Sequence, residues 1–195
     1  MVSKASNQNI GETDLIRGCL GGDARMQEEL YHRFAPKMYA VCLRYSNNTD
    51  DAQDLLQEGF IKIFKNLDRF RAEGSFEGWI RRVFVNTSIE HYRRKVNLFS
   101  TSEREETMIE DGSWNALDKL AEKDIIELVQ ELSPGYRTVF NMYVIEGYSH
   151  KEIGTLLNIS DGTSKSQLAR AKGILQKRVE EFLEEKRKPL TRRDV

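Results

Sequence analysis

The sequence predicts an all-α protein of two small helical domains joined by an acidic linker, with a helix-turn-helix in the second domain. Three observations lead to this fold class. Apolar residues recur at spacings of three and four along most of the chain, no stretch alternates apolar and polar residues for long enough to form a sheet, and only three prolines interrupt the 195 residues. Hydrophobic residues at 39% and charged residues at 31% indicate a folded and very soluble chain.

The first domain is expected at residues 1–96 and contains four helices. Between Thr13 and Tyr45 the apolar spacing predicts helices on both sides of a GGD break, where Asp23 is suited to be an N-cap. The polar stretch SNNTDD ends that pattern and supplies caps and acids for the next helix, DAQDLLQEGFIKIFKNL. A further break at RAEGS precedes the fourth helix, FEGWIRRVFVNTSIEHYRRK, which has an aromatic start and a basic end.

An acidic flexible linker is expected at residues 97–116, where acids and hydroxyl residues are frequent and periodicity is weak. Periodic apolar residues return at Leu117, so the second domain is expected at residues 117–185, followed by a basic tail at 186–195. Within this domain Ser133 and Pro134 mark the start of a helix, because proline is favoured at the first helical position.

The stretch SHKEIGTLLNISDGTSKSQLARA predicts two helices that are separated by a very short turn. Ser149 and Glu152 fit a capping box, Asn158 tolerates the left-handed backbone of a sharp turn, and Ser160 is suited to cap the second helix. The second helix runs on through Leu175 in this interpretation. Its residues facing the scaffold are Ser164, Leu168, Ala171 and Leu175.

The opposite face of this second helix carries short and long polar groups, which suit entry into the major groove of DNA. Ser166 and Arg170 lie there with the small Ala169 between them, and Lys165 and Lys172 flank them. The stretch is therefore interpreted as a helix-turn-helix. The alternative is a helical hairpin with a solvated charged face.

In the first domain, the third helix has an acidic face, and the fourth helix together with the segment before it combines aromatic with basic residues. Rings that stack on unpaired bases, together with cations that hold phosphates, are what a single nucleic-acid strand requires. In the alternative interpretation, Phe76 and Trp79 are core residues and the acids form only a solvated helix face. The acidic face consists of Asp50, Asp51, Asp54, Gln57 and Glu58, and the aromatic and basic set consists of Phe70, Phe76, Trp79, Arg81, Arg82, Arg93, Arg94 and Lys95.

The net charge of −1 hides an uneven distribution along the chain. Residues 1–99 hold 15 Lys and Arg against 13 Asp and Glu, residues 100–131 hold 3 against 10, and residues 132–195 hold 12 against 8. Two basic blocks therefore flank an acidic middle. A nucleic-acid-binding protein needs such local patches rather than a global excess of positive charge.

Other classes of site find little support in the sequence. Cys19 and Cys42 lie in apolar helical patterns and are expected as buried free thiols. The three histidines lack the spacing of a metal-dependent hydrolase, so we expect no catalytic residue, metal, cofactor or small-molecule substrate. No secretion signal and no apolar stretch of membrane-spanning length occur, which predicts a cytoplasmic protein.

Two long stretches together resemble a known family. The stretch DDAQDLLQEGFIKIFKNLDRFRAEGSFEGWIRRVFVNTSIEHYRRK resembles region 2 of the extracytoplasmic-function (ECF) sigma factors, the smallest class of bacterial RNA polymerase sigma subunits. The stretch LSPGYRTVFNMYVIEGYSHKEIGTLLNISDGTSKSQLARAKGIL is similar to their region 4. The two regions follow in the order of the family, with a linker where the family has one.

The resemblance implies roles for residues of the first domain. Asp54, Gln57 and Glu58 would dock on the coiled coil of the largest polymerase subunit. Asn86 matches a position that holds a flipped-out base of the minus-ten element, and Phe70 belongs to the loop that forms the pocket. The remaining residues expected at the melted strand are Phe76 and Trp79, with Arg81, Arg82, Arg93 and Arg94 as phosphate contacts.

The resemblance likewise implies two sets of DNA contacts in the second domain, both directed at the minus-thirty-five element. The positions that face the bases are Lys165, Ser166, Ala169 and Arg170. The positions that steady the backbone of this duplex are Tyr136, Arg137, Ser149 and Lys151.

The predicted function is that of a sigma factor, which binds core RNA polymerase and directs promoter-specific initiation. It would read the minus-ten element as a melted single strand and the minus-thirty-five element as duplex. The expected partners are core polymerase, promoter DNA and an anti-sigma factor, which in this family is often anchored in a membrane. The alternative is a stand-alone helix-turn-helix regulator that binds duplex tightly without polymerase. A purely protein-binding adaptor would leave the two basic blocks unexplained.

Overall fold

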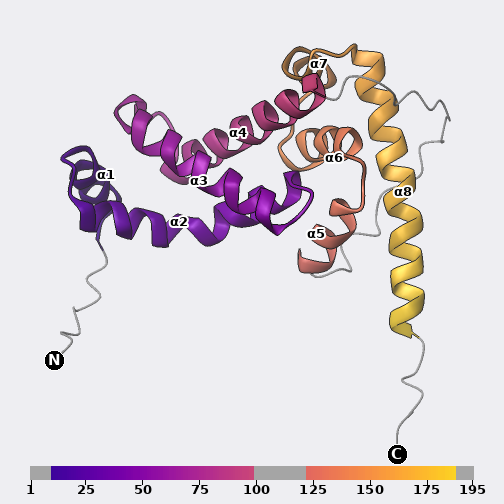
Figure 1. The fold of residues 1–195 in the computed structure, drawn as a ribbon, viewed down its shortest axis with the longest axis horizontal. Coiled ribbons are helices and arrows are strands. Elements are labelled where there is room, and N and C mark those ends of the chain that lie inside the picture. The colour runs from indigo at the N-terminus through magenta and orange to yellow at the C-terminus, as the bar shows by residue number, and fades with distance from the viewer. Residues whose placement is uncertain (1–9, 99–121, 188–195) are drawn as a thin grey trace, which may run out of the picture. The chain divides into compact units, whose positions relative to one another are not determined.

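A computed structural model of the chain describes residues 10–98 and 122–187 (Figure 1). Eight α-helices make up most of these two ranges, and no β-strand occurs within them, so the predicted all-α fold is confirmed. No helix among these residues is long and apolar enough to cross a membrane. The predicted linker lies almost entirely outside the described residues, as does most of the predicted basic tail.

Internal contacts divide the chain into two compact units. One combines Met1–Cys42 with Gln53–Thr87, and the other combines Leu43–Ala52 with Ser88–Val195. The helices α2, α3 and α4 each contribute to both units. The domains predicted from the sequence, residues 1–96 and 117–185, were placed by the order of the motifs along the chain. Their boundaries differ from this division into units and stay a prediction.

The four helices predicted for the first part of the chain are all present. Polar side chains begin three of them, as expected of N-caps. Asp23 Oδ1 accepts from the backbone N–H of Arg25 at 2.9 Å, and Asn48 Oδ1 accepts from that of Asp51 at 2.8 Å. Ser75 Oγ accepts in the same way at the start of the fourth. The helices are α1 Glu12–Leu20, α2 Ala24–Tyr45, α3 Thr49–Asn66 and α4 Phe76–Leu98, with a short 3-10 helix, η1 Leu67–Arg69, before α4.

Aromatic rings fill the core between α2, α3 and α4. Phe84 of α4 is fully buried and meets Phe60 of α3 edge-on, with 5.3 Å between the ring centroids. Its ring also lies over Gly59, where α3 has no side chain to keep α4 away. Phe76 of α4 is fully buried against Phe34 of α2. These contacts set the position of α4, which carries the residues expected at the melted strand.

The second part of the chain folds around one long helix. The helices α6 and α7 pack along α8, and α5 contacts it as well (Figure 1). The sequence predicted α8 through Leu175, but it continues to Arg187, because Val179 is buried and Lys186 pairs with Asp124 of α5 at 2.9 Å. The elements are α5 Glu122–Gln130, α6 Pro134–Phe140, the π-helical turn η3 Asn141–Ile145, α7 His150–Leu157 and α8 Asp161–Arg187.

Cys19 and Cys42 are buried free thiols, as predicted. Burial raises the pKa of Cys19, and the nearby carboxylate of Asp23 raises it further. The thiolate, which is the reactive form, is therefore disfavoured at this position.

We expect Gly59→Ala to lower the free energy of unfolding by about 1–3 kcal/mol, because the new methyl group would overlap the ring of Phe84. An alanine in an open helix position would instead stabilise by about 1 kcal/mol. Urea denaturation followed by circular dichroism measures the change. The control is Gly74→Ala, in the loop before α4, where a Cβ meets nothing within 4 Å. A Gly59 variant as stable as this control would contradict the packing described.

Candidate functional site

The helix-turn-helix is built by the local interactions that the sequence predicts. Ser149 Oγ accepts from the backbone N–H of Glu152 at 3.3 Å, and the Glu152 carboxylate accepts from the backbone N–H of Ser149 at 2.8 Å, which completes the capping box. Asn158 has φ 57° and ψ 47°, the left-handed conformation that ends α7. Ser160 Oγ then caps α8 by accepting from the N–H of Thr163 at 3.0 Å.

The helix α8 has the two faces that its spacing predicts. Lys165 and Ser166 are exposed on the outer face, and Ala169 and Arg170 are half-buried beside them. A helix face that mixes small and long polar side chains fits the major groove. The residues on the inner face are all buried, namely Ser164, Leu168, Ala171 and Leu175.

The residues predicted to steady the backbone of the upstream duplex divide into two groups. Ser149 and Lys151 are exposed at the start of α7, and Tyr136 is half-buried at the start of α6. The Tyr136 hydroxyl accepts from Arg170 Nη1 at 3.4 Å, so a predicted backbone contact and a predicted base contact lie side by side.

Arg137 differs from this group because it is buried, with 3% of its surface exposed. Its Nη2 donates to the carbonyl oxygens of Gln130 and Leu132 at 2.9 and 2.7 Å. Carbonyl groups at the end of a helix lack partners within the helix, and Arg137 satisfies those at the end of α5. Its guanidinium is not available to a phosphate in this structure, so we correct the prediction that Arg137 contacts DNA.

The aromatic residues predicted at the melted strand also divide by burial. Phe76 is 0% exposed and is surrounded by the rings of Phe34, Phe70 and Trp79, at centroid distances of 5.6, 5.0 and 6.0 Å. It offers no face to a base, and we correct the prediction that it contacts the strand. Phe70 and Trp79 are half-buried and lie 5.7 Å apart, with Phe76 as their common support.

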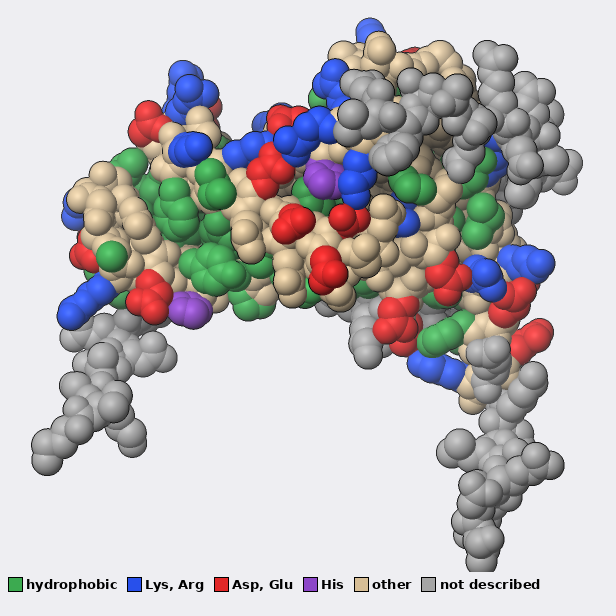
Figure 2. Space-filling view, in the orientation of Figure 1, with side chains coloured by type: hydrophobic (Ala, Val, Ile, Leu, Met, Phe, Trp, Pro, Cys, Tyr) green, Lys and Arg blue, Asp and Glu red, His purple; other side chains and the backbone are tan. Residues whose placement is uncertain are grey.

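An exposed stripe runs along α4 from these rings. At about 100° per residue, Trp79, Arg82, Asn86 and Arg93 fall within an arc of about 60° of the helix, and Arg94 lies about 60° beyond that arc. These residues are exposed, except for the half-buried Trp79. Figure 2 shows Lys and Arg side chains following α4. Arg81 lies on the opposite side of the helix, so it is not part of this stripe.

No group of three or more His, Cys, Asp or Glu side chains in residues 10–98 and 122–187 is arranged to hold a metal ion. The described residues instead form three surfaces that are suited to binding other molecules. These are an acidic face on α3, an aromatic and basic stripe on α4, and the outer face of α8.

Comparisons with known proteins identify the same two regions. Residues 30–97 match the model of sigma-70 region 2, and residues 122–175 match that of sigma-70 region 4. The RNA polymerase sigma-H factor of Pseudomonas aeruginosa is 27% identical over 89% of this chain and 96% of its own length. The ECF RNA polymerase sigma factor SigE of Mycolicibacterium smegmatis is 30% identical over 76% of this chain and 60% of its own length. A solved structure of the sigma factor RpoE with the anti-sigma factor NepR from Bartonella quintana aligns with a TM-score of 0.45 at 21% identity, covering 78% of this chain and 96% of that one.

The chain belongs to the ECF sigma factors. It is a transcription initiation factor that acts with RNA polymerase at promoters. The stand-alone helix-turn-helix regulator is not favoured, because the match at residues 30–97 includes a whole region that such a regulator does not need.

The acidic face of this ECF sigma factor lies on α3. Asp54 and Gln57 are exposed, and Glu58 is half-buried with Lys62 Nζ 3.1 Å from its carboxylate. Ile61 is 52% exposed and follows Gln57 and Glu58 at helical spacing.

Sequence reasoning missed Ile61 as a surface residue. The sequence nevertheless indicates this position, because Ile61 follows Gln57 by four residues and Glu58 by three, which places it on the polar side of α3. Tyr31 of α2 is also exposed and packs on Phe60, with 4.6 Å between the ring centroids. Figure 2 shows hydrophobic side chains gathered over α2 and α3. The sigma factor therefore presents apolar surface next to its acidic face.

The capping box makes a pH-dependent prediction. The pKa of Glu152 is lowered, because the backbone N–H and the hydroxyl of Ser149 both donate to its carboxylate. A depressed folded pKa gives stability that is present above the unfolded carboxyl pKa and is lost as the pH falls through the folded pKa. In Ser149→Ala we expect the pKa of Glu152 to rise toward its ordinary value, which NMR titration of the carboxyl carbon measures.

The same variant should lower the Tm at neutral pH by roughly 4 °C, and the deficit should shrink in acid. The matched control is Ser160→Ala, which removes a cap that involves no carboxylate, so its deficit should change little with pH. An unchanged pKa of Glu152 in Ser149→Ala would rule out this account.

Proposed function

We propose that this ECF sigma factor divides its work between two modules. Residues 1–96 would act as region 2, which docks on core polymerase and stabilises the melted minus-ten element. Residues 117–185 would act as region 4, which reads the minus-thirty-five element as duplex. Residues 97–116 would link them, and residues 186–195 would form a basic tail. The observation that supports the proposal is the presence in one chain of two different polar surfaces, the aromatic and basic stripe on α4 and the outer face of α8.

For polymerase docking we propose Asp54, Gln57 and Glu58, which share one side of α3. Two of them are exposed, and none is in the apolar core. A carboxylate face attracts a basic partner and favours correct encounter through charge complementarity. The partner surface is the coiled coil of the largest polymerase subunit, as the family resemblance implies.

For the melted strand we propose the stripe on α4 together with Phe70. Half-buried rings can stack on an unpaired base, and base stacking on an aromatic side chain contributes roughly 1–3 kcal/mol. Arginines along the same face can neutralise phosphates as the strand follows the helix. Asn86 lies between the rings and the far arginines, where it can hydrogen-bond an unstacked base. The proposed residues are Phe70, Trp79, Arg82, Asn86, Arg93 and Arg94.

For the upstream duplex we propose that α8 enters the major groove. Lys165, Ser166 and Arg170 can reach base edges, and Ala169 is limited to van der Waals contact, for example with a thymine methyl group. Phosphates of the same duplex would be held by Tyr136, Ser149 and Lys151.

We propose that the protein performs no bond-making step of its own, and that it works in the cytoplasm, where the polymerase is. We further propose an anti-sigma factor as a partner, as the family resemblance implies.

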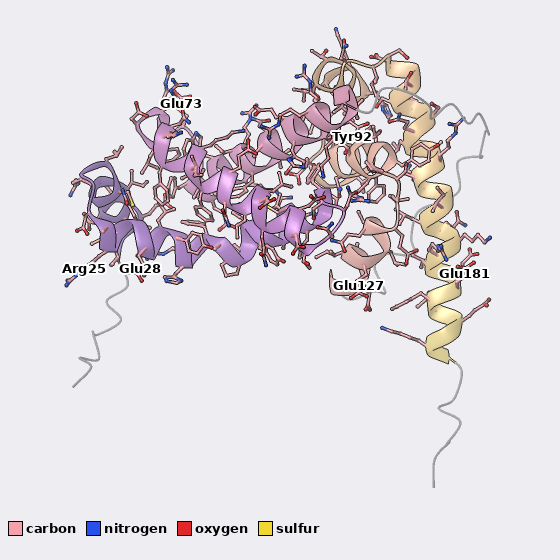
Figure 3. The ribbon with its side chains drawn as sticks, viewed as in Figure 1. Arg25, Glu28, Glu73, Tyr92, Glu127 and Glu181 are labelled. Atoms are coloured by element: carbon pink, nitrogen blue, oxygen red, sulfur yellow. The ribbon has the colours of Figure 1, made fainter. Side chains whose placement is uncertain are left out.

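Transcription in vitro with purified core enzyme tests the division of labour. Glu58→Lys should weaken core binding by roughly tenfold, because it places a cation where the partner is basic. Arg170→Ala should leave core binding intact and reduce transcription roughly tenfold from promoters that depend on the upstream element. The charge-reversal control is Glu181→Lys on α8, an exposed acid that is labelled in Figure 3 and pairs only with surface cations in the described residues. Core binding and transcription by Glu58→Lys at wild-type levels would refute the docking proposal.

Salt dependence tests the phosphate contacts separately. Each phosphate contact releases counterions, so removing one should reduce the slope of log affinity against log salt by about 0.9. We expect this reduction for Lys151→Ala when the holoenzyme binds promoter duplex. Lys177→Ala is the control, because this lysine is equally charged and exposed but lies outside the proposed contact set. Equal slopes for both variants would remove Lys151 from the interface.

A further inference from the structure

His150, the first residue of α7, connects three elements of the region that carries the helix-turn-helix. Its ring stacks on Tyr143 of η3, with centroids 4.4 Å apart and planes inclined by 20°. Its Nδ1 lies 2.9 Å from Ser164 Oγ of α8. The hydrogen bond therefore joins the start of the first helix of the motif to the inner face of the second.

Ser164 is fully buried, although serine is a polar residue. A buried hydroxyl without a partner costs free energy, so native structures supply one. In a neutral imidazole one nitrogen accepts and the other donates, and a hydroxyl can do both, so either tautomer satisfies the pair. An apolar residue could fill this inner position without tying α8 to α7. The serine makes the contact directional.

Ser164 also immediately precedes two of the residues proposed to face DNA bases, Lys165 and Ser166. One residue along a helix corresponds to about 100° of rotation and 1.5 Å of rise. A hydrogen bond at Ser164 thus restrains how α8 is rotated and advanced relative to α7, and with it the direction of the next two side chains. Base readout depends on that direction, since a misplaced donor loses its partner.

We propose that His150 is a positioning residue for readout of the upstream element: through Ser164 it holds α8 in the orientation that presents Lys165 and Ser166 to the bases. This role rests on the proposed function of region 4. His150 need not touch DNA, and its neighbours Ser149 and Lys151 are the exposed residues of that segment.

The charges around the ring agree with a structural rather than a phosphate-binding imidazole. Burial lowers the pKa of His150, and the ammonium groups of Lys165 and Lys172 lower it further, while the carboxylate of Asp161 opposes them. Tyr143 is the ring that faces it from η3. The lowered pKa favours the neutral imidazole, which keeps both a donor and an acceptor.

Three substitutions separate the hydrogen bond from simple packing. His150→Phe keeps a ring to stack on Tyr143 but removes Nδ1. Ser164→Ala removes the hydroxyl and leaves the histidine in place. His150→Asn keeps a hydrogen-bonding amide near the position of Nδ1, so it is the conservative variant expected to restore function.

The measurement is transcription by reconstituted holoenzyme from a promoter with an intact upstream element and from one with that element substituted. The ratio of the two rates reports discrimination and does not depend on the amount of active protein. We expect His150→Phe and Ser164→Ala each to lower the ratio roughly three- to tenfold. Transcription from a pre-melted template without the upstream element should stay near the wild-type level. His150→Asn should recover most of the ratio.

The double variant His150→Phe with Ser164→Ala should be no worse than either single variant, because both remove the same bond. Additive losses would overturn the proposal, because they would show that the two residues act independently. Rates that fall equally on all templates would also overturn it, because they indicate loss of stability alone. If the wild-type protein transcribes without regard to the upstream element, the proposed function of region 4 fails, and the role of His150 fails with it.

Discussion

The whole architecture depends on how the backbone groups at its helix ends are satisfied. A helix leaves four N–H groups at its start and four carbonyl groups at its end without internal partners, and short helices have many ends for their length. In this chain, side-chain oxygens accept hydrogen bonds from backbone N–H groups at the starts of α2, α3, α4, α7 and α8. At the end of α5, Arg137 of α6 supplies the donors. Because each cap defines where a helix begins, the caps also define which residues face outward.

Packing then decides how much of each functional residue remains accessible. Phe76 lies beneath Phe70 and Trp79 and holds both rings at the surface, so a core residue and two candidate strand contacts form one cluster. Gly59 lets the ring of Phe84 approach α3 closely, so α4 packs tightly against that helix. The first part of the stripe on α4 therefore rests on a packed core, and such preorganisation reduces the cost of binding a flexible single strand.

Charge is organised locally rather than across the molecule. A net charge of −1 allows an acidic face on α3 and basic residues on α4 and α8, each suited to a different partner. A protein that binds both a polymerase surface and DNA needs this separation, since a uniformly basic surface would favour DNA everywhere.

The sequence by itself determined most of the helices, the caps at Asp23, Ser149 and Ser160, the turn at Asn158 and the inner and outer faces of α8. Ser133 was also predicted as an N-cap, but its side chain makes no such hydrogen bond. These features depend on residues no more than about four positions apart, where spacing along the chain is also spacing in space. The family likeness was readable for the same reason, because the motifs are contiguous.

The tertiary structure alone decided which of Phe76 and Trp79 is core, that Arg137 caps a neighbouring helix, and that His150 reaches Ser164. It also decided that α8 continues beyond Leu175. Each of these outcomes depends on residues brought together from separate elements, and no local sequence pattern specifies which elements pack against each other. Burial and hydrogen bonding at those meetings are properties of the folded chain.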